Sequence, residues 1–144
     1  MPDAPPDYEH RVRDSFARQA FMATLGARLT RVAPGEVTIE LAPRPELGQQ
    51  HGFVHAGAVT SIVDSACGYA AYTMMPADSD VLSVEFKVNL LAPAIGDLLV
   101  ATGRVVRAGR TLTVCQGEVV ARAAGEERTV AVMQATMMRL DPAR

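Results

Sequence analysis

The sequence predicts an α+β fold in which a curved antiparallel sheet of about six strands wraps one long central helix. Two observations carry this prediction. The most apolar helical pattern lies in the middle of the chain, over residues 55–75, and strand-like segments flank it on both sides. A sheet built from hairpins leaves an apolar face open to water unless another element covers it, and one buried helix supplies that cover.

Composition is typical of an ordinary globular protein. The 144 residues suit one domain, spanning 1–144, and hydrophobic residues make up 49% of them. That share is too high for a disordered chain. The net charge of -2 lacks the basic excess of a nucleic-acid reader, so we expect no nucleic-acid partner.

The lack of a signal-peptide pattern and the setting of the two cysteines favour a reducing intracellular compartment. Residues 1–10 are acidic and contain prolines, without the basic-then-apolar order of a signal peptide. No apolar run approaches the roughly 20 residues that a membrane span needs. Cys67 and Cys115 lie in apolar stretches outside any CxxC grouping, which favours reduced core thiols. We expect a soluble cytoplasmic protein without membrane contact.

The first part of the chain should form a helical segment and two strands. After a loose tail over 1–7, apolar side chains recur at three- and four-residue steps over 8–25, and Gly26 ends the pattern. Two strands follow, over 27–33 and 36–41, joined by a tight Pro-Gly turn.

The central helix is expected over residues 55–75, after an irregular stretch over 47–54. Its apolar residues fall on one broad stripe, made of Val59, Ile62, Val63, Ala66, Ala70 and Met74. Alanine and glycine are dense here, so the helix can lie close to whatever covers it. Pro76 ends the run, and such a helix is roughly 30 Å long at about 1.5 Å per residue.

Four long strands should complete the chain. Their ranges are 81–91, 98–107, 111–123 and 128–140. The first of them shows the clearest alternation of apolar and polar residues. Parts of the second and fourth carry apolar residues on both faces, which indicates that another subunit covers part of the sheet.

Asp64 is the main catalytic candidate because it lies midway through an otherwise apolar helix. A carboxylate is almost never buried without a partner. Two structural alternatives are a solvated helix face and hydrogen bonds from Thr60 or Ser61, one turn back. Yet Ser61, Ser65 and Gly68 are too small to shield the carboxylate, and they leave room for a substrate atom or water. A carboxylate poised there can act as general base or nucleophile.

The start of the same helix offers a second set of groups, from His55, Ala56 and Gly57. The first backbone N–H groups of a helix lack internal partners, and the helix dipole is positive there. They can polarise a thioester carbonyl and hold the oxyanion that forms on attack. The alternative for His55 is a hydrogen bond to a loop carbonyl. His51 lies four residues earlier with no acid between, and we expect no metal site.

Geometry separates these two sets of groups. Ala56 and Asp64 lie roughly 12 Å apart along one helix, so one thioester carbon cannot touch both. If both act together, they come from two copies of the helix. A two-fold axis repeats each contact and creates two equivalent sites. The sequence therefore predicts a homo-oligomer whose active sites lie between subunits.

These residues resemble the phenylacetate-pathway (PaaI-like) branch of the hotdog-fold acyl-CoA thioesterases. The likeness covers about residues 48–140. It rests on His55-Ala56-Gly57 with Asp64, and on Ser83-Val84-Glu85-Phe86 and Asn89 before Pro93. The resemblance implies a hotdog fold, a homodimer or a dimer of dimers, and an acyl-CoA substrate. Coenzyme A is then part of the substrate, and no cofactor is needed.

The resemblance also implies roles for single residues. A family histidine and glycine open the helix, with the glycine N–H as oxyanion hole, and His55 and Ala56 take those positions. The family's carboxylate falls on Asp64, and a Ser or Thr on the following strand, from the partner's side, resembles Ser83. Gln49 stands where the family has an asparagine that places the water or thioester. Ala56 keeps the N–H with less room, and Gln49 can shift substrate preference.

The family binds coenzyme A near a hairpin between two late strands. That hairpin resembles residues 107–111 here, where Arg107, Arg110 and the Gly109 backbone would meet phosphates, with Thr111 beside them. Gly57 permits close approach of the ligand at the helix start. The alternative for the arginines is that they are exposed hairpin charges.

The expected reaction is hydrolysis of R–CO–S–CoA to a carboxylic acid and free coenzyme A. Two rivals share the fold. One is a module that holds acyl-CoA or a fatty acid without cleaving it. The other is a hydratase or dehydratase, which would aim Asp64 and His55 at the acyl α and β carbons.

Overall fold

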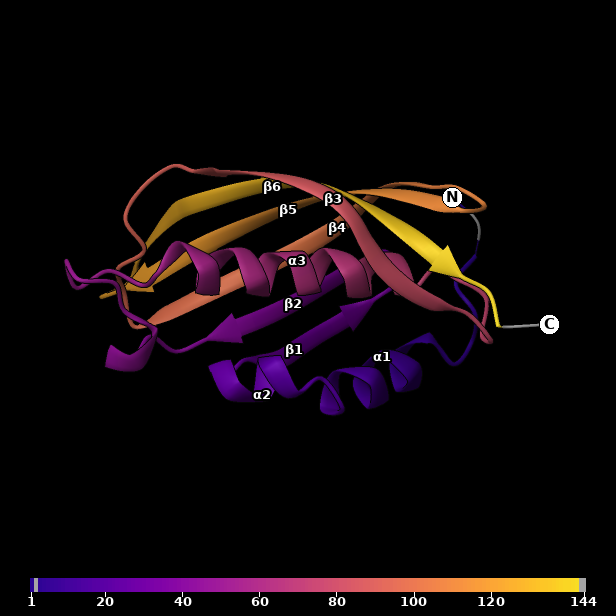
Figure 1. The fold of residues 1–144 in the computed structure, drawn as a ribbon, viewed down its shortest axis with the longest axis horizontal. Coiled ribbons are helices and arrows are strands. Elements are labelled where there is room, and N and C mark those ends of the chain that lie inside the picture. Colours follow the sequence, from indigo (N-terminus) through magenta and orange to yellow (C-terminus); the bar gives the residue numbers. More distant parts are fainter. Residues whose placement is uncertain (2, 143–144) are drawn as a thin grey trace.

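The central helix of the computed structural model is wrapped by a six-stranded antiparallel sheet, which confirms the predicted architecture (Figure 1). The structure describes residues 1 and 3–142, and no helix among them is long and apolar enough to cross a membrane. The elements are α1 Tyr8–Ala17, α2 Ala20–Leu25, β1 Arg28–Ala33, β2 Glu36–Leu41, η1 Pro45–Leu47, α3 Ala56–Tyr72, β3 Asp80–Leu90, β4 Leu98–Ala108, β5 Leu112–Ala123 and β6 Glu126–Leu140.

The N-terminal helical segment consists of two helices. The chain leaves the helical path at Gln19, whose ψ is 93°, and this separates α1 from α2. Gly26 ends α2 in the left-handed conformation, with a φ of 75°, as expected of a glycine stop. The break points the Gln19 side chain at α3, where its Nε2 lies 3.4 Å from the Ser65 hydroxyl oxygen.

The sheet order is β1-β2-β4-β5-β6-β3, and every pairing is antiparallel. Consecutive hairpins would place β3 beside β4. Instead β4 pairs with β2, while β3 crosses to the far edge of the sheet and pairs with β6. The strand with the clearest alternation in the sequence is therefore an edge strand with one side unpaired.

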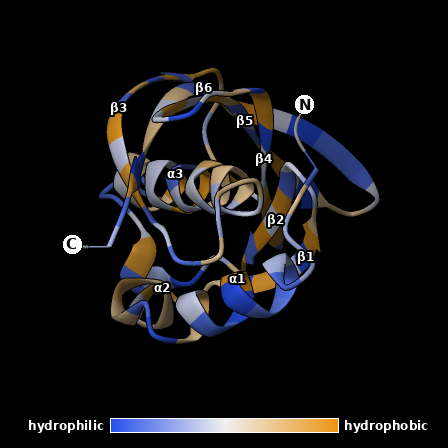
Figure 2. Cartoon of the chain, turned by 90° about the vertical axis from the view of Figure 1, so that its right-hand side faces the viewer, coloured by the Kyte–Doolittle hydropathy of each residue, from blue (hydrophilic) through white to orange (hydrophobic). Residues whose placement is uncertain are grey.

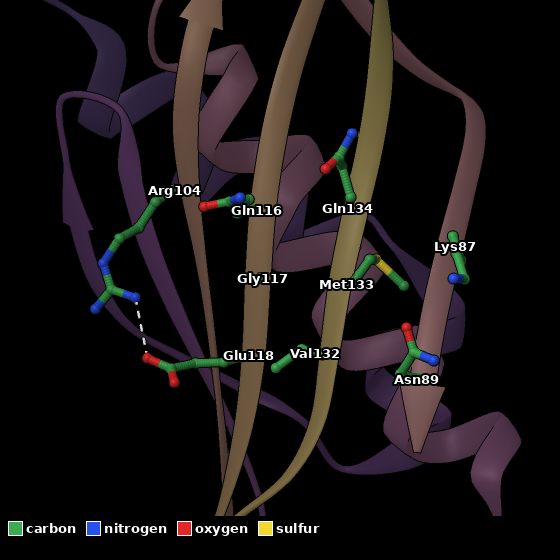
Figure 3. A pocket seen from close by; sticks show the side chains of 9 residues that line it. All are labelled: Lys87, Asn89, Arg104, Gln116, Gly117, Glu118, Val132, Met133 and Gln134. Atoms are coloured by element: carbon green, nitrogen blue, oxygen red, sulfur yellow. Dashed lines mark hydrogen bonds and ion pairs between the residues drawn. The ribbon is translucent and has the colours of Figure 1, made fainter. Parts of the chain in front are cut away.

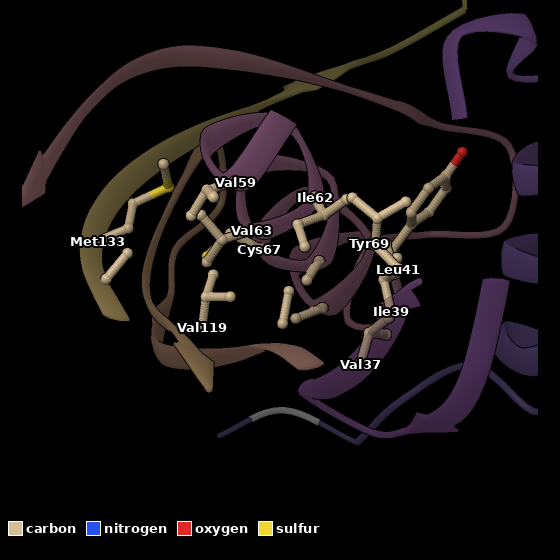
Figure 4. Close-up of a cluster of buried hydrophobic side chains, with 14 of the residues drawn as sticks. Val37, Ile39, Leu41, Val59, Ile62, Val63, Cys67, Tyr69, Val119 and Met133 are labelled. Carbon is tan, nitrogen blue, oxygen red and sulfur yellow. The ribbon is translucent and has the colours of Figure 1, made fainter. Parts of the chain in front are cut away.

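The core lies between α3 and the concave face of the sheet, which curves around the helix (Figures 2 and 4). The helix expected over 55–75 ends at Tyr72, so Met74 of the expected stripe lies beyond it and is half-buried, while the other stripe residues are buried. Both cysteine thiols are buried, and neither forms a disulfide. Burial raises the pKa of Cys115 to about 12. The α3 residues that keep solvent exposure are Ala56, Gly57, Thr60, Ser61, Asp64 and Gly68.

Two glycines let α3 lie against the sheet. A Cβ added to Gly103 would lie 2.4 Å from backbone atoms of Ala66 and Cys67, and one added to Gly117 would lie 2.5 Å from Val63. The first contact is with backbone, which no side-chain rotation relieves. The density of small residues on α3 is matched by small residues on the facing strands.

We expect Gly103→Ala to lower the free energy of unfolding by about 1–3 kcal/mol or more, because the new methyl group must push α3 off the sheet. The measurement is the urea midpoint. Gly68→Ala is the matched control, because its added Cβ would meet only Met137 Sδ at 4.0 Å. It should leave the midpoint unchanged or raise it. Equal midpoints for the two variants would contradict this account of the packing.

Candidate active site

The start of α3 presents one unused backbone donor. His55 is the N-cap, and its Nδ1 accepts a hydrogen bond of 2.7 Å from the Gly57 N–H. A neutral imidazole that accepts at Nδ1 carries its proton on Nε2, so His55 can donate outward. Within residues 1 and 3–142, nothing accepts a hydrogen bond from the Ala56 N–H. Ala56 therefore supplies the donor that remains for a ligand.

The position of Gly57, in the first turn of α3, favours a residue without a side chain. A Cβ at this position would lie 3.0 Å from His55 Nδ1, which is tighter than ordinary contact. The missing side chain lets the imidazole close over the first helical turn. The loop-carbonyl alternative for His55 holds for the backbone alone: the His55 N–H donates to the Leu47 carbonyl at 2.8 Å, whereas within the described residues the ring bonds to the helix itself.

Gln49 holds the loop that leads into α3. Its Oε1 accepts hydrogen bonds from the His51 and Phe53 N–H groups, and its backbone N–H donates to the Phe53 carbonyl at 2.8 Å. With the carbonyl end occupied, the amide has its NH2 end free to donate. A hollow of about 550 Å³ lies beside Gln49, His55 and Ala56. Its other walls are mainly apolar, from the loop after β3 and from Phe53, Val54, Val59, Leu90 and Val130.

Asp64 is half-buried and bonds across to β3. Its Oδ1 accepts a hydrogen bond of 2.7 Å from the Ser83 hydroxyl. Burial raises the pKa of this carboxyl group above its ordinary value, and the Ser83 bond opposes that rise. Ser61 donates to the Gly57 carbonyl instead, so the one-turn-back partner weighed from the sequence is wrong for Ser61. A raised pKa suits a carboxylate that must accept a proton.

A second hollow, of about 180 Å³, opens beside Asp64 and Ser83. Its remaining lining residues are Gln19, Ser65, Gly68, Tyr69, Val81 and Leu82. The hollow at the helix start and the hollow at Asp64 share no residue. One chain therefore carries two separate halves of the expected site, as the helix geometry requires.

The edge strand β3 connects these two halves. Near its start, Val81, Leu82 and Ser83 line the hollow at Asp64, and its last residue, Leu90, lines the hollow at Ala56. Large apolar side chains on this unpaired strand are exposed, with Leu82 at 52% and Val84 at 51%. Exposed apolar edge strands pair with another strand or aggregate. A second β3 running antiparallel would bring opposite ends of the two strands together.

The hairpin over residues 107–111 is only partly as expected. The Gly109 N–H donates to the Leu112 carbonyl at 2.9 Å, so the expectation that the Gly109 backbone meets a phosphate is wrong. Arg110 lines a hollow of about 280 Å³ at the C-terminal end of α3, together with Arg139. Arg107 does not line that hollow, and Thr111 uses its carbonyl to bond the Arg139 N–H.

Another hollow of about 550 Å³ lies on the convex face of the sheet (Figure 3). Lys87, Gln116 and Gln134 line it, beside the ion pair of Arg104 with Glu118. None of the site residues expected from the sequence lines it. The sheet separates it from the open face of Asp64.

Two residues near the hollows escape sequence reasoning. Gln19 reaches the hollow at Asp64 because the chain breaks between α1 and α2. Arg139 lines the same hollow as Arg110, since the Arg139 N–H bonds to the carbonyl of the neighbouring Thr111. Neither has a motif around it. A single arginine late in a strand and a glutamine in a helical pattern look like surface residues until the fold is known.

Comparisons with known proteins agree on one family. A family model described as "Thioesterase superfamily" matches residues 51–128. A solved thioesterase family protein from Silicibacter pomeroyi is 51% identical, with a TM-score of 0.92 over 94% of this chain and 99% of that one. The E. coli PaaI protein of the phenylacetic acid degradation operon shares the fold at 20% identity, with a TM-score of 0.87 over 98% and 99% of the chains. A 1,4-dihydroxy-2-naphthoyl-CoA hydrolase from Listeria monocytogenes is 24% identical, over 63% of this chain and 74% of its own.

Proposed function

Because this chain belongs to the thioesterase superfamily, we propose that it hydrolyses an acyl-CoA thioester to a carboxylic acid and free coenzyme A. The hotdog fold expected from the sequence is confirmed. The single observation that carries the proposal is the pair of half-sites: an unused N–H at Ala56 and a carboxylate of raised pKa at Asp64. A cytoplasmic location stays a prediction from the sequence.

The active unit in this proposal is a dimer formed along β3. Two copies of β3 pair antiparallel about a two-fold axis, so the Asp64 end of one strand meets the Ala56 end of the other. Support comes from the position of β3 at the edge of the sheet and from its exposed apolar side chains. The solvent-exposed residues of α3, from Ala56 to Gly68, also face this open side. Light scattering should give a dimer or a multiple of it.

The chemistry divides between the two copies. The thioester carbonyl oxygen accepts hydrogen bonds from the Ala56 N–H and the free NH2 end of Gln49 in one copy. Asp64 of the other copy takes a proton from water, and the water oxygen bonds to the carbonyl carbon. The carbonyl then re-forms as the C–S bond breaks, and the departing thiolate takes the proton from Asp64 to become free coenzyme A. Direct attack by Asp64, followed by hydrolysis of the anhydride, is the alternative sequence.

Coenzyme A phosphates have a candidate contact at Arg110. This arginine and Arg139 face one hollow, although Arg139 also pairs with Asp141 at 2.7 Å. Arg110→Ala should therefore raise KM for acyl-CoA more than it lowers kcat. Arg107 lines none of the hollows described above, so the contact implied for it by the family resemblance lacks that support.

A thiol-release assay against a panel of acyl-CoAs tests the proposed function. Release of free coenzyme A at a rate above background supports hydrolysis. Binding of acyl-CoA without release would favour the non-catalytic binding module. Addition of water to an enoyl-CoA, or its reverse, without release would favour the hydratase or dehydratase.

The activity should fall as the pH drops through the pKa of Asp64, because only the ionised carboxylate can accept the proton. Ser83→Ala removes the hydrogen bond that lowers this pKa, so the acid limb of kcat/KM should move to higher pH. Ser61→Ala is the control, because Ser61 bonds to Gly57 and not to Asp64. An acid limb that stays in place or moves to lower pH in Ser83→Ala would contradict this role.

A further inference from the structure

The edge strand β3 carries two opposite charges on one face. Glu85 and Lys87 stand opposite Thr136 and Gln134 of β6, and Lys87 lies on the convex face of the sheet beside Gln134 (Figure 3). Lys87 is the only lysine in the sequence, and no ion pair within residues 1 and 3–142 involves it or Glu85. Since β6 offers both charges uncharged neighbours, the open side of β3 is where an opposite charge can reach them.

Symmetry restricts how two copies of β3 can pair. In an antiparallel pair about a two-fold axis, residues that stand opposite each other point to the same face of the sheet. Over residues 85–90, where the β3–β6 ladder has no shift, the strands can therefore slide past each other only in steps of two residues. The residue on the axis stands opposite its own copy, so each register is defined by that residue. The candidates are Glu85, Phe86, Lys87 and Val88.

Charge selects one of these four registers. An axis at Glu85 sets two carboxylates opposite each other, and an axis at Lys87 sets two ammonium groups opposite each other. An axis at Val88 leaves Lys87 opposite Asn89 of the other copy. Only an axis at Phe86 places Glu85 of each copy opposite Lys87 of the other, which gives two ion pairs. Opposite charges directly across an antiparallel pair stabilise it, whereas like charges destabilise it.

The same register suits the apolar side of β3. Phe86 stands opposite the buried Ala135, so it points to the concave face of the sheet, and 43% of it is exposed in the single chain. On the axis, this ring meets the ring of its own copy. Aromatic pairs across antiparallel strands stabilise the pairing, so one register buries the apolar side chain and joins the charges.

A shift in the ladder carries this register to the two half-sites. The pairing of β3 with β6 skips one residue between Ser83 and Glu85. When the skipped residue is counted, Val81 of one copy stands opposite Leu90 of the other. Val81 lines the hollow beside the carboxylate, and Leu90 lines the hollow at the helix start. The register that charge selects therefore makes the two halves of the site neighbours.

We propose that Glu85 and Lys87 set the register in which two copies of β3 pair, with Phe86 on the two-fold axis. This inference rests on the dimer of the proposed function and names the residues that align its two half-sites. The partner is a second copy of this chain, because an identical strand running the other way presents each charge with its opposite. A slip by two residues would displace the half-sites by roughly 7 Å along the strand.

Disulfide cross-linking tests the register without any substrate. A disulfide needs Cα atoms within about 7 Å, which directly opposed residues satisfy and diagonal neighbours do not. Phe86→Cys should therefore form a covalent dimer on mild oxidation, whereas the matched controls Glu85→Cys and Lys87→Cys should stay single chains on a non-reducing gel. The two controls refolded together should cross-link with each other. The native Cys67 and Cys115 are buried and should not contribute.

Charge reversal tests the same assignment with Phe86 left in place. Lys87→Glu and Glu85→Lys each turn both ion pairs into like-charge pairs, so each variant alone should have a dimer dissociation constant raised about tenfold or more. A mixture of the two variants recovers two opposite-charge pairs. Heterodimers should therefore form at the expense of both homodimers, which native mass spectrometry resolves by mass.

Cross-linking of Glu85→Cys alone or Lys87→Cys alone, in place of Phe86→Cys, would overturn the register. Equal dimer dissociation constants for the wild type and both charge-reversed variants would overturn the role of the charges. Charges on an edge strand also serve to prevent pairing, and a wild-type monomer in light scattering would assign Glu85 and Lys87 that role instead. None of these readouts uses thiol release, so a failure of the register and a failure of the proposed hydrolysis are told apart.

Discussion

Replacing Asp64 by asparagine should leave a folded protein whose thioester turnover is lower by about 10²- to 10⁴-fold, the range for loss of a general base. The amide has the shape of the carboxylate and can still accept the Ser83 hydrogen bond, but it cannot take a proton from water. Substrate binding should change little, so the loss should appear in kcat. Wild-type turnover in Asp64→Asn or Asp64→Ala would remove Asp64 from the mechanism.

The same substitution should raise the melting temperature at neutral pH. Burial raises the pKa of Asp64, so ionisation is less favourable in the folded chain than in the unfolded chain. The carboxyl group is therefore least destabilising below the ordinary pKa of aspartate, and its penalty grows as the pH rises through the raised pKa. Asparagine carries no charge and removes the penalty. The gain in melting temperature should vanish in acid, which a thermal scan at two pH values measures.

Replacing Ala56 by proline should lower kcat by about 10²- to 10³-fold, because it deletes the one backbone N–H assigned to the oxyanion and leaves only the Gln49 side chain to donate. Proline is well tolerated at the first position of a helix, where its missing N–H has no helical partner. His55 already has a φ of -59° and a ψ of 138°, an extended conformation that a following proline favours. The substitution therefore removes a donor while keeping the helix.

Ala56→Gly is the matched control, since glycine keeps the N–H and restores the residue that the related family has. It should retain turnover. Circular dichroism and the melting temperature of Ala56→Pro should match those of the wild type. Full activity in a folded Ala56→Pro variant would show that the oxyanion is held elsewhere.

Most of the fold could be predicted from local patterns in the sequence. The alternation in Glu36–Leu41 and the apolar stripe of α3 are local patterns. The strand β2 lies where the alternation predicts it, and α3 begins where expected but ends at Tyr72, before the expected end at residue 75. The position of β3 in the sheet cannot be predicted from its local pattern. An antiparallel strand shows the same alternation whether it lies at an edge of the sheet or beside β4. The break at Gln19 was missed because apolar residues continue at helical spacing on both sides of it.

The candidate site divides in the same way. His55 and Ala56 stand out because a helix start leaves backbone N–H groups without internal partners, and Asp64 stands out because an acid in an apolar helix is chemically unusual. The occupied Gly109 N–H and the approach of the Gln19 amide to Ser65 depend on atoms brought together by the fold, and no spacing rule gives them. The family resemblance implied roles for single residues. The hydrogen bonds of the folded chain decide which of their donors and acceptors remain available to a ligand.

The most direct measurement mixes two inactive variants, Asp64→Asn and Ala56→Pro, after unfolding and refolding them together. If each site combines Ala56 of one copy with Asp64 of the other, every mixed dimer has one site with both groups intact. Random pairing then restores about one quarter of the wild-type activity, since half of the dimers are mixed and each has one of two sites working. Restored activity at that level is the predicted result. A refolded mixture that stays as inactive as its two parents would contradict a site shared between subunits.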